Sequence, residues 1–206
     1  MSLRSVYRSV ARAVAIPLLR YGPARLLVRS DRFLRALVDA WGNPEWSADV
    51  AYLRAIVTHC STARVVLESG SGVSTLIAAA AVPRGCTVIA IEHLDEWADR
   101  VESKRPRASI LRRPIVNCGN YDWYEVRPSD LPTGIEVVIC DGPPGVTRGG
   151  RYGLLPQARG AFAPGALILL DDAQRPGEAD VIARWEKEGV VLESIDGGTA
   201  LLRVDA

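Results

Sequence analysis

Residues 65–75 of the chain read VVLESGSGVST, and this stretch decides the fold that we expect. An apolar run ends in the acid Glu68, and two glycines, Gly70 and Gly72, then lead into a series of small and apolar residues. Glycine is favoured where a ligand passes close to the backbone or where φ is positive, and a helix that starts after such a turn offers unpaired N–H groups to an anion. The stretch therefore predicts a buried strand, a tight turn and a helix around a nucleotide-like ligand.

Downstream of this stretch, short β-branched runs alternate with longer amphipathic stretches, which is typical of parallel strands joined by helices. The strands that we expect are 64–68, 87–92, 109–116, 136–141, 166–171, 190–194 and 200–204. The expected helices are 74–81, 95–104, 154–163 and 178–188, with a further helix capped by Ser47 and running to about Thr58. This alternation predicts an α/β fold with a Rossmann-like, doubly wound sheet and helices on both faces.

Length and composition favour one catalytic domain. The chain has 206 residues, 48% of them hydrophobic, and 25 basic residues nearly balance 24 acidic ones, so no global charge favours binding to nucleic acid. The four cysteines form no CxxC pair or zinc-type cluster. No apolar run reaches the roughly 18 to 20 residues that a membrane span needs, and we expect a cytoplasmic protein.

The N-terminal residues differ from the rest of the chain. Residues 1–30 hold six arginines and no acid, and a helix over 3–16 would place Arg4, Arg8 and Arg12 opposite an apolar side. We expect residues 1–45 to form a basic helical extension and 46–206 to form the catalytic domain. The extension is expected to cover a second subunit of a homo-oligomer or to lie peripherally on an anionic membrane.

A second acid marks the end of the next expected strand. Glu92 follows Gly72 by 20 residues, where a carboxylate can accept hydrogen bonds from both ribose hydroxyls of an adenosine. Dinucleotide-binding domains share this pairing, but the third glycine of their GxGxxG pattern is replaced here by Thr75. The chain also has no Tyr/Lys pair for hydride transfer, so an NAD-dependent oxidoreductase is disfavoured.

Four motifs follow one another along the chain: the run from Glu68 to Thr75, the strand end at Glu92, the segment DGPPG at 141–145 and the pair Asp171-Asp172. In this order and spacing they resemble class I S-adenosylmethionine (SAM)-dependent methyltransferases. Over roughly residues 45–206 the chain is similar to the small bacterial branch related to catechol and caffeoyl-CoA O-methyltransferases. The resemblance implies a seven-stranded sheet with the last strand antiparallel, SAM above the first two strands and the acceptor above the fourth and fifth.

The resemblance also implies roles for residues around the cofactor. Glu92 would hold the ribose and His93 would touch the adenosine, whereas Trp123 is expected in the core. The remaining residues implied to bind SAM are Glu68, Gly70 and Gly72 at its methionine part, Ser74 and Thr75 at the start of the helix, Tyr121 and Asp122 near the adenine, and Asp141.

Methyl transfer from a sulfonium is an in-line displacement, so a hydroxyl acceptor must be held close and must lose its proton. Asp141 is the candidate catalytic residue, and Asp141, Asp171 and Asp172 at strand ends would suit Mg²⁺ or another divalent cation. The lysine base that the catechol-type relatives often supply is replaced here by Pro143, Pro144 and Gly145. The three acids are alternatively structural groups at strand ends.

The glycine-rich segment 142–153 is a candidate lid over this site. Arg148, Arg151 and Tyr152, together with Arg175, are candidate contacts for an anionic acceptor such as a carboxylate or a phosphate. Two hypotheses remain open on the sequence. The first is a SAM-dependent O-methyltransferase that acts on a small molecule, and the second is a non-catalytic SAM-binding or nucleotide-binding module that its N-terminal helix attaches to a membrane or a partner.

Overall fold

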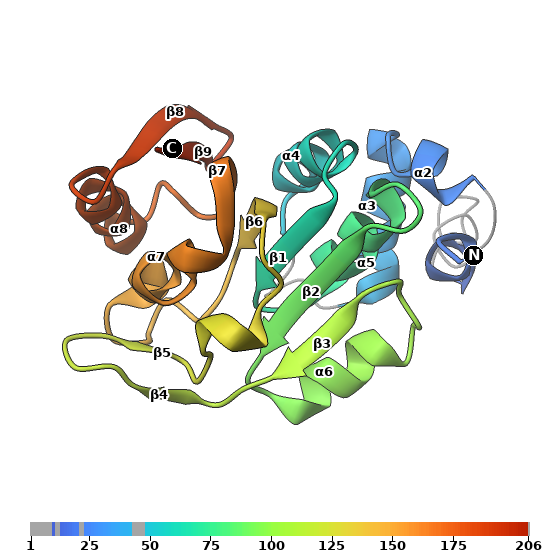
Figure 1. The fold of residues 1–206 in the computed structure, drawn as a ribbon. Coiled ribbons are helices and arrows are strands. Elements are labelled where there is room, and N and C mark those ends of the chain that lie inside the picture. The colour runs from blue at the N-terminus through green and yellow to red at the C-terminus, as the bar shows by residue number, and fades with distance from the viewer. Residues whose placement is uncertain (1–9, 11–12, 21–22, 43–47, 206) are drawn as a thin grey trace.

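A seven-stranded sheet forms the centre of the molecule in the computed structural model, which describes residues 10, 13–20, 23–42 and 48–205 (Figure 1). The strands run in the order β3-β2-β1-β6-β7-β9-β8. Neighbours from β3 to β7 are parallel, and β9 is antiparallel to both β7 and β8. The expected sheet with an antiparallel last strand is therefore confirmed. The strands are β1 (Val65–Ser69), β2 (Thr87–Glu92), β3 (Ser109–Arg112), β6 (Ile135–Cys140), β7 (Phe162–Leu170), β8 (Val190–Asp196) and β9 (Thr199–Val204).

Helices cover both faces because successive strand residues point to opposite sides. Val66 lies in one apolar core with helices α3 to α6, and Leu67 lies in the other with α7 and α8. The helices are α2 (Ala24–Leu27), α3 (Asp31–Trp41), α4 (Val50–Cys60), α5 (Val73–Ala81), α6 (Asp95–Glu102), α7 (Leu154–Ala158) and α8 (Pro176–Glu186), with 3₁₀ segments η2 (Pro128–Asp130), η3 (Gly150–Gly153) and η4 (Arg159–Ala161).

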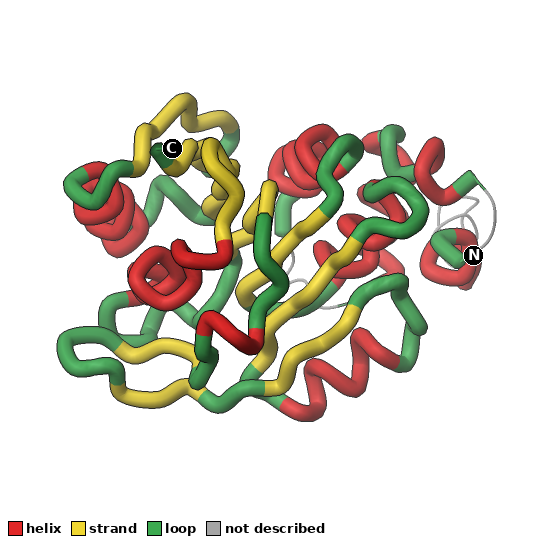
Figure 2. Tube along the Cα trace, in the orientation of Figure 1, coloured by secondary structure: helices red, strands yellow, loops and turns green. Residues whose placement is uncertain are grey.

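The strand that we expected over 109–116 is two separate elements. β3 ends at Arg112, which pairs with the last residue of β2, and Pro114, which has no N–H to donate, follows shortly after. The chain then forms an antiparallel hairpin of β4 (Ile115–Asn117) and β5 (Asp122–Tyr124), which lies outside the main sheet (Figure 2). This hairpin adds an aromatic segment beside the ends of the parallel strands.

Two other element boundaries also differ from the prediction. Helix α7 ends at Ala158 and β7 begins at Phe162, ahead of the expected 166, because Pro164 and Gly165 interrupt its apolar pattern without ending the strand. Helix α4 begins at Val50, where the Asp49 side chain accepts a hydrogen bond from the Tyr52 N–H at 2.7 Å. Asp49 is thus the cap in place of Ser47, which lies outside the described residues.

The described part of the N-terminal extension belongs to the core. Leu34, Leu37 and Trp41 of α3 are buried in the same apolar cluster as α4 and α5. Most of the predicted helix over 3–16 lies outside the described residues, but Ala15 is buried in this cluster too. Residues 31–41 and Ala15 therefore pack with the residues that follow position 45, whereas Val10 and Val14 are exposed; the boundary at residue 45 stays a prediction.

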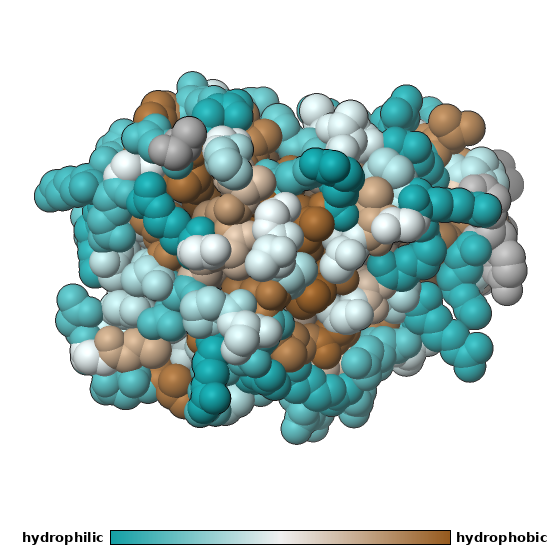
Figure 3. Space-filling model, in the orientation of Figure 1, coloured by the Kyte–Doolittle hydropathy of each residue, from teal (hydrophilic) through white to brown (hydrophobic). Residues whose placement is uncertain are grey.

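The surface in this orientation has an apolar centre. Figure 3 shows that hydrophobic residues gather near the middle of the face and that hydrophilic residues surround them. Within the described parts of the chain, no helix is both long enough and apolar enough to cross a bilayer.

Leu37→Ala tests whether α3 is part of the core. Leu37 is fully buried, so the substitution should lower the free energy of unfolding by about 2 to 5 kcal/mol, measured by urea denaturation. Leu26→Ala is the matched control, because Leu26 is 67% exposed and its loss should change stability little. Equal effects of the two substitutions would mean that α3 does not contribute to the core.

Candidate functional site

Two glycines bring the ends of β1 and β6 into backbone contact. Gly70 has a φ of 86°, and the Gly142 N–H donates to the Ser69 carbonyl at 2.7 Å. A β-carbon on Gly142 would lie only 2.8 Å from the Gly70 nitrogen and 2.3 Å from the Tyr124 hydroxyl. The two glycines therefore form a cradle, the glycine cradle, in which backbone lies where side chains would otherwise project.

Glu68 is buried near the end of β1, two residues before Gly70. The Thr75 hydroxyl donates to Glu68 Oε2 at 2.5 Å and accepts from the Gly72 N–H at 2.9 Å. Glu68 Oε1 is buried and has no hydrogen-bond partner among the described residues. Burial raises the pKa of Glu68 to about 8, against an opposing effect of the Ser74 and Thr75 hydroxyls. One oxygen inside the site thus lacks the donor that a buried polar atom requires.

Glu92 closes the other side of the turn. Its Oε2 accepts from the Ser71 N–H at 3.0 Å and the Ser71 hydroxyl at 2.9 Å, and its Oε1 accepts from the N–H groups of His93 and Leu94. The Trp97 indole N–H donates to the Ser71 carbonyl and fixes the turn from outside. Four donors therefore occupy the carboxylate, and the Ser71 hydroxyl is the one among them that side-chain rotation can replace.

Tyr124 is a site residue that the sequence reasoning missed. Its hydroxyl is buried beside Gly142 and has no hydrogen-bond partner in the described structure, and burial raises the pKa of this phenol. The ring lies edge-on to His93, with centroids 6.1 Å apart. Only the hairpin register brings Tyr124 to the cradle, so the sequence triplet Asp122-Trp123-Tyr124 carries no signal that would single it out.

The other aromatic candidates have different partners. Tyr121 packs edge-on against Tyr152 and accepts a hydrogen bond from Gln157 at 2.8 Å. Asp122 forms an ion pair with Arg148 at 2.5 Å. Trp123 is buried, as expected for a core residue. Contacts of Tyr121 and Asp122 with an adenine stay predictions. In the structure, these two side chains belong to the hairpin and contact Tyr152 and Arg148 of segment 142–153.

The three acids do converge. Asp141, Asp171 and Asp172 each offer a carboxylate oxygen within 4.8 Å of the others, at the ends of β6 and β7. Loss of hydration raises the pKa of Asp141, although Arg151 opposes the shift. The same cause, reinforced by the charge of Asp141, raises the pKa of Asp171. Asp141 and Asp171 therefore bind protons more readily than carboxylates in water do.

Arg151 lies inside this cluster and not at its surface. Its side chain is only 2% exposed, and it donates to Asp141 Oδ1 at 2.7 Å and to Asp172 Oδ2 at 3.2 Å. It also pairs with the buried Glu178 at 3.3 Å. Contact of Arg151 with an acceptor stays a prediction, and in this structure its donors face acids of the protein. Glu178 had no sequence signal, since it reads as an ordinary acid near a helix start.

The remaining candidates for acceptor binding separate from one another. The Tyr152 hydroxyl donates to Glu188 at 2.6 Å, away from the acids, whereas Arg175 pairs with Asp172 at 2.8 Å and stays 59% exposed. Arg148 fastens the expected lid to the hairpin, since its carbonyl accepts from the Asp122 N–H and its guanidinium contacts the same residue. Of the four candidates, Arg175 alone presents an accessible cation beside the acid cluster.

Glycines hold segment 142–153 against the hairpin. A β-carbon on Gly149 would lie 2.7 Å from the Tyr121 β-carbon, and one on Gly153 would lie 2.7 Å from the Trp123 ring. The segment is therefore packed closely on β5 and its preceding turn, in contrast to the loosely attached lid that its glycine content suggested.

No protein-family model and no curated protein matches the chain, but solved structures do. An SAH-bound methyltransferase of Podospora anserina has a TM-score of 0.60 at 15% identity, over 90% of this chain and 89% of that one. Cofactor-bound Rv0187 from MTB has a TM-score of 0.59 at 18% sequence identity, over 89% of this chain and 90% of that one. An O-methyltransferase of Bacillus cereus in complex with SAH has a TM-score of 0.56 at 14% sequence identity, over 96% of this chain and 97% of that one. The chain thus has the fold of the class I SAM-dependent methyltransferases.

Gly142→Ala should damage the glycine cradle. The added methyl group would overlap backbone atoms of Gly70, so the free energy of unfolding should fall by about 1 to 3 kcal/mol, measured by chemical denaturation. Gly160→Ala is the control, because no atom lies within 4 Å of the position of its added β-carbon. A Gly142→Ala protein as stable as the control would show that the two loops can separate without cost.

Proposed function

We propose that the chain is a SAM-dependent methyltransferase that transfers a methyl group to an oxygen of a small-molecule acceptor. The observation that carries the proposal is the glycine cradle, which lies between the buried acids Glu68 and Glu92 at the carboxyl ends of parallel strands. In open α/β sheets, ligands bind outside these strand ends, at the position where the chain order reverses. Here β1 and β6 are the neighbours at which it reverses.

The polar groups around the cradle fit SAM. The unpartnered Glu68 Oε1 can accept from an ammonium group, and the unpartnered Tyr124 hydroxyl can bond a polar group of the ligand. Glu92 can bond the ribose if the Ser71 hydroxyl rotates away, while the three backbone donors keep the carboxylate in place. SAM supplies an electrophilic methyl group on a sulfonium when it is bound.

Asp141 is the proposed base for the acceptor hydroxyl. Its raised pKa makes it a stronger proton acceptor than an exposed aspartate, which offsets part of the loss of the lysine at 143–145. The accessible guanidinium of Arg175 supports an acceptor that carries a carboxylate or a phosphate. Mg²⁺ on Asp141, Asp171 and Asp172 is a poorer fit, because Arg151 already contributes a positive charge to the cluster.

Calorimetric titration with SAM tests the cofactor site. Glu92→Ala should weaken binding by about 1.5 to 3 kcal/mol, the range for a hydrogen bond to a charged group. Ser71→Ala is the matched variant, since it removes the competing hydroxyl and should leave the affinity equal or higher. Thermal melting checks that both variants are folded. Unchanged SAM affinity of a folded Glu92→Ala protein would contradict the ribose assignment.

Turnover separates the enzyme from a non-catalytic SAM-binding module. A panel of small hydroxylated carboxylates and phosphates, assayed for formation of the demethylated product, should yield at least one acceptor whose methylation falls with Asp141→Asn. SAM binding without turnover on any member of the panel would favour the module that the sequence left open.

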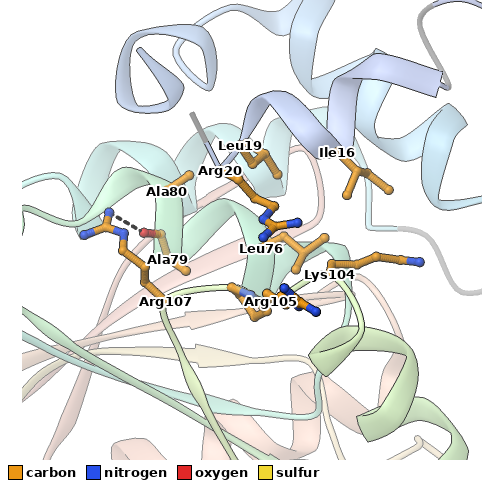
Figure 4. A pocket seen from close by; sticks show the side chains of 10 residues that line it. Ile16, Leu19, Arg20, Leu76, Ala79, Ala80, Lys104, Arg105 and Arg107 are labelled. Carbon is orange, nitrogen blue, oxygen red and sulfur yellow. Dashed lines mark hydrogen bonds between the residues drawn. The ribbon is translucent and has the colours of Figure 1, made fainter. Parts of the chain in front are cut away.

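We also propose that the N-terminal face lies on an anionic membrane surface. A cavity of about 140 Å³ lies between residues 16–20, α5 and the segment after α6, and both apolar and basic side chains line it (Figure 4). Its lining includes the basic residues Arg20, Lys104, Arg105 and Arg107 and no acidic residue. Val14, Leu18 and Leu26 near the same end of the chain are exposed. A twofold contact between copies would place like charges together, which favours a membrane over the homo-oligomer.

Flotation with lipid vesicles tests this surface. The full chain should float with phosphatidylcholine vesicles that contain phosphatidylserine and not with phosphatidylcholine alone. Lys104→Glu with Arg105→Glu should weaken the binding at least about tenfold, while Arg127→Glu with Lys187→Glu, the same charge change on other exposed residues, should have a smaller effect. Failure to float, or a dimer in analytical ultracentrifugation, would overturn the membrane proposal.

A further inference from the structure

The buried guanidinium of Arg151 lies among the carboxylates of the acidic cluster. Arg151 comes from the 3₁₀ segment η3, and its guanidinium reaches the ends of both β6 and β7. It donates to the main-chain carbonyls of Asp141 and Asp171 and to carboxylate oxygens of Asp141 and Asp172, and it pairs with Glu178 of α8. Five oxygens of four residues therefore surround a single side chain.

We propose that Arg151 is the resident cation of this cluster and takes the place in which a divalent metal ion would otherwise be expected. Arg151 is then a positioning residue: it holds Asp141 at the end of β6 and does not itself touch the acceptor. The inference rests on the proposed function only for its catalytic consequence, since the charge arrangement is a property of the folded chain alone.

Arg151 supplies one of the two positive charges that offset the four carboxylates Asp141, Asp171, Asp172 and Glu178. Glu178 is 4% exposed and Arg151 is 2% exposed, and a buried charge of either sign is tolerated only when it is paired and hydrogen-bonded. Arg175 supplies the second positive charge, from the solvent side of Asp172. A divalent ion among the same carboxylates would add its two charges beside a guanidinium that cannot lose its proton.

One oxygen of each carboxylate in the cluster is already engaged within the protein. Asp141 Oδ1 and Asp172 Oδ2 accept from Arg151, and Asp171 Oδ1 accepts from the Asp172 N–H at 2.9 Å. Two of the five Arg151 acceptors are backbone carbonyls, which cannot turn toward an ion without moving the strand ends. A planar, multidentate guanidinium suits this set of fixed acceptors better than a compact ion does.

The arrangement narrows the class of acceptor. Without a metal ion, two neighbouring hydroxyls on a substrate gain nothing from chelation, so a vicinal diol has no advantage over a single hydroxyl. Selection then depends on the anionic group that the accessible Arg175 can receive. The acceptor class that follows is a small molecule with one reactive hydroxyl and a carboxylate or a phosphate.

Thermal melting in the presence of Mg²⁺, Ca²⁺ or EDTA tests the inference. The melting temperature of the unmodified chain should be the same in all three. Arg151→Met removes the cation, so this variant should melt lower and should recover by about 2 to 4 °C with millimolar Ca²⁺ or Mg²⁺. Arg151→Lys keeps the charge and should show no metal response. Stoichiometric binding of Mg²⁺ or Ca²⁺ by the unmodified chain, or a metal-dependent rise in its melting temperature, would overturn the proposal.

A second variant covers the case in which Arg151→Met does not fold. The double variant Arg151→Met, Glu178→Gln removes both charges of the buried pair, so it should fold. Its melting temperature should rise with Ca²⁺ as that of Arg151→Met does. A folded double variant that shows no response would overturn the proposal. None of these measurements requires SAM or turnover, so a chain that fails to bind SAM contradicts the proposed function and leaves this inference intact.

Discussion

The close approach of Gly70 and Gly142 is the constraint on which the rest of the site depends. A β-carbon on either residue would press against backbone of the opposite loop, so the ends of β1 and β6 can meet only if both positions lack a side chain. The meeting point determines where Glu68 and Glu92 lie relative to each other and how far Asp141 stands from them. It also leaves backbone, and not side chains, as the floor on which a ligand would rest.

Buried charge is handled differently on the two sides of this floor. On the β1 and β2 side, burial raises the pKa of Glu68, and four hydrogen-bond donors stabilise the carboxylate of Glu92. On the β6 and β7 side, the acids are compensated by the cation of Arg151. Where the carboxylates stand apart, hydrogen bonding and protonation stabilise them. Where three carboxylates converge, a cationic side chain stabilises them.

The sequence predicted what periodicity and strand ends can reveal. The parallel sheet, the glycine turn and the convergence of the three acids follow from short-range patterns, whereas the antiparallel last strand was implied by the resemblance to a family. The break after Arg112 and the position of Tyr124 depend on how a hairpin pairs, which no local pattern encodes. Arg151 reads as one more arginine of a glycine-rich loop, and its burial results from the docking of η3 under α8, a long-range contact that residue spacing does not report.

The tight packing of segment 142–153 on the hairpin has a mechanical consequence. Gly149 and Gly153 let the segment lie directly on Tyr121 and Trp123, and the Asp122 N–H bonds to the Arg148 carbonyl, so the two pieces move as one body. Any opening above the acids therefore carries the aromatic hairpin with it. Since Tyr124 belongs to that hairpin and lies beside Gly142, the same motion would also displace a side chain of the glycine cradle.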